Sequence, residues 1–85
     1  MSEAISVMAT RLQNEKKFRQ WVELPDGGRR YWIDVPGRLG WLARYVKVVD
    51  ADETTQRFWQ EIYDDQGNLQ EVHEKFPVDM GHRKT

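Results

Sequence analysis

The chain has 85 residues, a net charge of −1 and no cysteine. This length suits one domain, 1–85, with a small core, and the missing cysteines exclude disulfides, thiolate nucleophiles and cysteine-based zinc sites. Charged residues make up 32% of the chain, so with so small a net charge any attraction to nucleic acid must come from a local patch. No apolar run approaches the roughly 20 residues of a membrane span, and the N-terminus does not resemble a signal peptide. We therefore expect no membrane association and a cytoplasmic location.

The first segment, residues 1–14, is expected to be a short helix or a flexible arm, because Ile5, Met8, Ala9 and Leu12 share one face of a helix over 2–13. Runs rich in aromatic and β-branched residues follow, bounded by Gly, Pro, Asp and Asn, which is typical of strands. Their ranges are 17–24, 29–35, 41–49, 56–63 and 69–76. Short connections make consecutive strands antiparallel neighbours. The sequence thus predicts a β-dominated α+β fold, an antiparallel meander of four to five strands over 17–76, with 77–85 as a loose tail.

The first hairpin is predicted to close with a two-residue turn at Asp26-Gly27, one of the strongest hairpin dipeptides. Such a turn places aromatic rings opposite each other and opposite charges across from each other, which favours strand pairing. The predicted pairs are Trp21–Trp32, Glu23–Arg30 and Arg19–Asp34.

Alternation along the strands sorts the side chains onto two faces. One face is predicted to be the core, with Phe18, Val22, Leu24, Tyr31, Ile33, Val35, Leu42, Val46, Val48, Phe58, Ile62, Val72 and Phe76. The other mixes the four tryptophans with charges, and its candidate binding residues are Trp21, Arg30, Trp32, Tyr45, Lys47, Arg57, Trp59, Glu61, Tyr63 and His73. The last strand, 69–76, places Val72 and Phe76 on the core face and His73 on the tryptophan face if a three-residue loop precedes it. That loop is either Asp65-Gln66-Gly67 or Gln66-Gly67-Asn68.

A face of tryptophans and charges has three interpretations. Arg and Lys stems could simply cover the indole rings. Trp, Tyr and Arg are also the residues enriched at protein-binding hot spots, and two copies could pack such faces together. Single-stranded nucleic acid could stack on the same rings, but the charge balance of the face is barely positive. We favour a non-enzymatic domain that binds a protein partner or forms a homodimer, with nucleic acid as a less favoured partner.

The C-terminal segment supplies a catalytic alternative, because both histidines of the chain lie there among acids and bases. His73 could act as an acid–base group in a ribonuclease, with Lys75 or Arg57 stabilising the developing charge. Histidine and carboxylates also bind metals, but His73 and His82 match no metal motif, so we predict neither a metal site nor a cofactor. His82 is expected to belong to no ordered site.

Three successive pieces near the C-terminus carry a family resemblance. They are the aromatic strand "QRFWQEIY", the turn "DDQGNL" and the stretch "HEKFPVDMGH". In this order they resemble small bacterial toxin proteins of the TumE type, over about the last third of the chain. The resemblance implies a role in a toxin–antitoxin pair. The chain departs from that family's clustered C-terminal histidines, because His73 and His82 are well separated.

Overall fold

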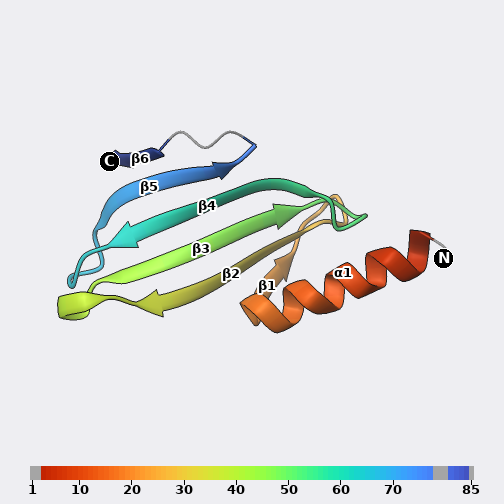
Figure 1. Ribbon diagram of the computed structural model, residues 1–85, viewed down its shortest axis with the longest axis horizontal. Coiled ribbons are helices and arrows are strands. Elements are labelled where there is room, and N and C mark those ends of the chain that lie inside the picture. Colours follow the sequence, from red (N-terminus) through yellow and green to blue (C-terminus); the bar gives the residue numbers. More distant parts are fainter. Residues whose placement is uncertain (1–2, 78–80, 85) are drawn as a thin grey trace.

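The structure, a computed structural model, describes residues 3–77 and 81–84. A helix, α1, is followed by strands that pair in sequence order as one antiparallel sheet, with α1 beside β1 and β2 and with β6 at the far edge (Figure 1). This confirms the predicted β-dominated α+β meander. The elements are α1 (Glu3–Phe18), β1 (Gln20–Glu23), β2 (Arg29–Pro36), the short 3-10 helix η1 (Arg38–Gly40), β3 (Leu42–Val49), β4 (Thr55–Tyr63), β5 (Leu69–Phe76) and β6 (Gly81–Lys84).

The helix α1 is longer than predicted, because it continues to Phe18. Lys16 and Lys17 occupy its last turn, where positive charge favours the helix dipole. Arg19 ends the helix in a left-handed conformation (φ 71°), and its N–H donates to the Glu15 carbonyl at 2.9 Å. Phe18, predicted to be a strand residue, is therefore the last helical residue. Within the described ranges, no helix combines the length and apolarity needed to cross a bilayer.

The core lies between the end of α1 and one face of the sheet, which we call the helix face. Phe18, Tyr31 and Val49 are almost fully buried there, and the rings of Phe18 and Tyr31 are 5.8 Å apart. Strand pairing gives the helix face the side chains of Trp21, Tyr31, Ile33, Tyr45, Lys47, Phe58, Gln60 and His73. It gives the opposite face, which we call the open face, those of Arg30, Trp32, Asp34, Arg44, Val46, Val48, Arg57, Trp59, Glu61, Tyr63, Val72 and Glu74.

The β1–β2 hairpin has a different register from the predicted one. Trp21 lies opposite Tyr31, and Trp32 lies opposite Gln20. The loop has three residues, 25–27, and its last residue, Gly27, is left-handed (φ 87°), a common three-residue hairpin geometry. The extra loop residue shifts the register by one and turns Trp21 onto the helix face. The predicted pairs Trp21–Trp32, Glu23–Arg30 and Arg19–Asp34 are therefore wrong.

Strand β3 also faces the other way from the prediction. Tyr45 and Lys47 lie on the helix face, while Val46 lies on the open face between Trp32 and Trp59. The connection through η1 decides this, because residues 39 and 40 both have positive φ and close a tight turn that fixes the strand register. The predicted core residues Leu42, Val46 and Val48 are thus on the open face, although Val46 is fully buried.

Strand β5 follows the predicted loop Asp65-Gln66-Gly67 but not the predicted alternation. The pairing with β4 is irregular between Ile62 and Tyr63, and a bulge of this kind inserts one residue. Val72 consequently lies on the open face and His73 on the helix face. The predictions that put Val72 in the core and His73 beside the tryptophans are wrong.

Part of the predicted tail is a strand. Residues 81–84 form β6 and pair with β5, so that His82 lies opposite His73. The expectation that 77–85 is a loose tail is therefore wrong for residues 81–84, which include His82. Asp79, another charged residue of that segment, lies outside the described residues.

Candidate functional site

The open face is organised as rows of residues that lie opposite each other on adjacent strands. The central row runs Trp32, Val46, Trp59 and Glu74 across β2 to β5. The two indoles flank Val46 and remove it from solvent, while both stay partly exposed. The row on one side holds Arg30, Val48 and Arg57, and the row on the other holds Asp34, Arg44, Glu61 and Val72. The face is therefore an aromatic band between a basic row and a row rich in acids.

Most polar groups of the open face bind one another. Arg44 donates two hydrogen bonds to Asp34, from Nε at 2.7 Å and from Nη2 at 3.0 Å. This bidentate bond, against the opposing effect of burial, lowers the pKa of the Asp34 carboxyl. Glu61 accepts hydrogen bonds from the Trp59 indole at 2.8 Å and the Tyr63 hydroxyl at 2.7 Å. Removing water from polar groups costs less free energy when these groups already have hydrogen-bond partners. The open face is therefore suited to burial against a partner.

Arg57 covers one indole of the aromatic band. Its guanidinium lies 4.4 Å from the ring centre of Trp59 and donates a hydrogen bond to Glu74. A planar guanidinium stacked on an indole is a common arrangement at protein interfaces. Arg57 thus covers part of the Trp59 ring, as one interpretation of the sequence expected. Trp59 nevertheless remains partly exposed, so it could still contact a protein partner.

The predicted binding residues are divided between the two faces. Those on the open face are Arg30, Trp32, Arg57, Trp59, Glu61 and Tyr63, and those on the helix face are Trp21, Tyr45, Lys47 and His73. Trp41, the fourth tryptophan, lies in the connection before β3 with 39% of its surface exposed. The four tryptophans thus do not form one surface.

The structure does not bring the predicted catalytic residues together. Arg57 lies on the open face, whereas His73 lies on the helix face opposite Gln60. Lys75 lines a pocket on the helix face, so only His73 and Lys75 share a side of the sheet. Among the described side chains, no three His, Cys, Asp or Glu residues gather as a metal ion would require.

A buried polar network on the helix face fastens α1 to the sheet. Its centre is Glu53, which is 4% exposed and accepts hydrogen bonds from Tyr31, from Asn14 at 3.3 Å and from Arg11 at 3.2 Å. Lys47 extends the network by donating to the Asn14 side chain at 3.1 Å. These groups join α1, β2, β3 and the loop before β4, so the network positions the helix over the sheet.

The buried phenol of Tyr31 makes stability depend on alkaline pH. Burial, followed by the hydrogen bond to Glu53, raises the pKa of Tyr31 to about 12. The unfolded phenol ionises near pH 10, so the unfolded chain loses this proton first as pH rises. The contribution of the Tyr31 phenol to the free energy of unfolding is therefore complete below about pH 10 and is lost between about pH 10 and 12. Over this range we expect the free energy of unfolding to fall by about 2 to 3 kcal/mol. Urea unfolding across this range measures the fall. An unchanged pH dependence in Tyr31→Phe would contradict the assignment.

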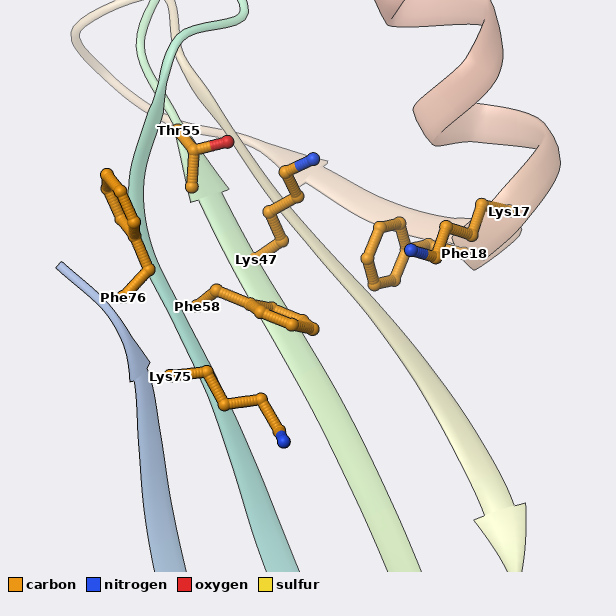
Figure 2. A pocket seen from close by; sticks show the side chains of 7 residues that line it. All are labelled: Lys17, Phe18, Lys47, Thr55, Phe58, Lys75 and Phe76. Atoms are coloured by element: carbon orange, nitrogen blue, oxygen red, sulfur yellow. The ribbon is translucent and has the colours of Figure 1, made fainter. Parts of the chain in front are cut away.

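A pocket of about 330 Å³ on the helix face was not predicted from the sequence (Figure 2). Its lining combines three lysines, three phenylalanines and one threonine: Lys17, Phe18, Lys47, Thr55, Phe58, Lys75 and Phe76. These residues come from the end of α1 and from three strands, so no local motif shows them together. We call this pocket the Lys–Phe groove.

No protein-family model, curated protein or solved structure matches this chain significantly. The resemblance of the C-terminal third to toxin proteins of the TumE type therefore stays a prediction.

Proposed function

We propose that this chain is a non-enzymatic binding domain whose open face associates with a second copy of the chain. The observation that carries the proposal is an aromatic band, Trp32, Val46 and Trp59, most of whose polar neighbours are already paired, on a sheet face that α1 does not cover. The partner could be a different protein, and the experiment below distinguishes the two.

The shape of the chain supports a missing partner. Its radius of gyration is 14.4 Å, whereas a compact chain of this length has about 12 Å. Its accessible surface is 6003 Å², against about 5300 Å² for a compact monomer of this mass. A single sheet with one partly covered face leaves apolar area that a second layer would normally bury.

The open face is large enough to take part in a specific interface. Its longest strand, β4, has nine residues and is therefore about 30 Å long, and the six strands of the sheet, about 4.8 Å apart, span about 24 Å. A face of this size approaches the roughly 800 Å² per partner of a standard interface. Trp and Arg side chains lie at the centre of this area, where hot spots concentrate.

The charge pattern of the open face favours a second copy. Three arginines, Arg30, Arg44 and Arg57, balance three carboxylates, Asp34, Glu61 and Glu74, so the face as a whole attracts neither polyanions nor polycations. A two-fold axis along the central row would place the basic row of one copy over the acid-rich row of the other. Such a contact is isologous and electrostatically complementary.

Trp59→Ser is expected to weaken the dimer by about 30-fold, because truncating a central aromatic anchor commonly costs ~2 kcal/mol. Arg30→Glu should weaken it as well, since it reverses a charge of the basic row. Sedimentation equilibrium measures both effects. Trp41→Ser is the matched control, because it makes the same chemical change outside the open face.

Two results would contradict the homodimer. One is a pure monomer at roughly millimolar concentration, far above the dissociation constant of a standard interface. The other is a dimer that Trp41→Ser weakens as much as Trp59→Ser. If the chain is monomeric and the NMR resonances of its open face shift only when another protein is added, the open face binds that protein and not a second copy.

A further inference from the structure

The Lys–Phe groove gathers three lysines, and no carboxylate is among its lining residues. Its lining includes Lys17, Lys47 and Lys75, and none of the ion pairs described within residues 6–77 involves them. The Lys47 ammonium instead donates to the neutral amide of Asn14. Burial and the nearby charge of Lys17 lower the pKa of Lys47, and the charge of Glu53 offsets this only in part. An anion in the groove would relieve the repulsion that these ammonium groups exert on one another.

The floor and rim of the groove are aromatic. Figure 2 shows the Phe58 ring between the Lys47 and Lys75 side chains, with Phe18 at the end of α1 and Phe76 on the far side. Phe18 is 1% exposed and offers no free ring surface, whereas Phe58 is partly exposed and Phe76 is 43% exposed. Lysines around accessible rings can hold a ligand that carries both negative charge and flat apolar surface.

The groove continues into a second pocket of about 250 Å³, which shares Lys17, Phe18 and Phe58 and adds Ile33 and Tyr45. The Tyr45 and Phe58 rings are close to parallel, with 27° between their planes and 6.4 Å between their centres. The aromatic path therefore extends beyond the first pocket. Two adjoining pockets can take successive units of a chain.

From this combination we propose that the Lys–Phe groove binds single-stranded nucleic acid, with phosphates at the lysines and bases against the accessible rings of Phe58 and Phe76. Bases can stack on protein rings only when they are not paired and stacked in a duplex. An acidic peptide would satisfy the lysines but would make no use of the aromatic path. The groove lies on the opposite side of the sheet from the proposed dimer surface, so the two proposals stand or fall separately.

Fluorescence anisotropy of the full chain with a labelled thymidine octanucleotide tests the proposal. When a protein binds a single strand, the slope of the logarithm of the association constant against the logarithm of the salt concentration is about −0.7 for each phosphate that the protein neutralises. Three lysines therefore predict a slope of about −2. Lys17→Gln and Lys75→Gln should each reduce the slope by about 0.7. Lys16→Gln is the matched control, because it removes the same charge from the neighbouring helical position outside the groove.

Phe76→Ala is expected to weaken binding by about 10-fold, the loss of one base–ring contact. Phe76 is exposed, so its truncation should leave the fold intact, and circular dichroism checks this. If the spectrum changes, binding is measured with Phe76→Leu instead, because this variant lacks the ring but keeps an apolar side chain of similar size. Three results would overturn the proposal: no binding at low salt, full binding by both lysine variants, or equal displacement of the octanucleotide by polyglutamate of the same charge. The last result would assign the groove to acidic peptides.

Discussion

The substitution Glu53→Ala is expected to lower the free energy of unfolding by about 3 to 5 kcal/mol, as breaking a buried charged network does. Glu53 has a side chain that is 0% exposed and is the shared acceptor for Tyr31, Asn14 and Arg11. Its removal leaves a buried phenol and a buried amide without this acceptor, and each such loss costs about 1 to 3 kcal/mol. The helix α1 would lose its main polar attachment to the sheet.

Urea unfolding followed by tryptophan fluorescence measures this effect. Asp52→Ala is the matched control, because it removes the same charge from the adjacent, exposed position of the same loop. It should change stability by less than about 0.5 kcal/mol. Equal losses in the two variants would show that the loop charge, rather than the buried network, is responsible.

Glu53 also shows where sequence reasoning reached its limit. The stretch "DADETT" predicts a turn, and a turn forms there, closed by the Asp50–Thr54 pair. In its third loop position Glu53 adopts a left-handed conformation (φ 63°) that carries its side chain beneath α1. Acids in turns are usually exposed, so no local pattern marks this one as buried.

The strands could be predicted because each is a run of aromatic and β-branched residues between turn residues. The face of each strand could not be predicted equally well, because one added residue in a loop or bulge reverses every side chain that follows. β4 was assigned correctly, with Trp59 on the open face and Phe58 on the helix face. Trp21 was misplaced by a three-residue loop and His73 by a bulge. The Lys–Phe groove depends on such reversals, since Lys47 had been placed with the tryptophans.

Gly28→Ala is expected to be destabilising by about 3 kcal/mol, at the upper end of the cost of overpacking. A Cβ at Gly28 would lie 2.2 Å from the Val49 carbonyl oxygen and 3.2 Å from the Asp50 Cα, both of which are backbone atoms. Backbone atoms cannot rotate away as a side chain can. The tips of the β1–β2 and β3–β4 hairpins would have to separate, next to the buried Val49 side chain.

The neighbouring Gly27 provides a control, because an alanine there would be strained by its backbone conformation and not by a close contact. Gly27 has a positive φ of 87°, but a Cβ there would meet only the Ala51 side chain at an ordinary 3.4 Å. Gly27→Ala should therefore cost only the left-handed backbone penalty of about 1 kcal/mol. Thermal and urea unfolding of the two variants compare them directly. If Gly27→Ala proves as harmful as Gly28→Ala, conformational freedom in the loop, and not the close approach of the two hairpins, determines the stability of this end of the sheet.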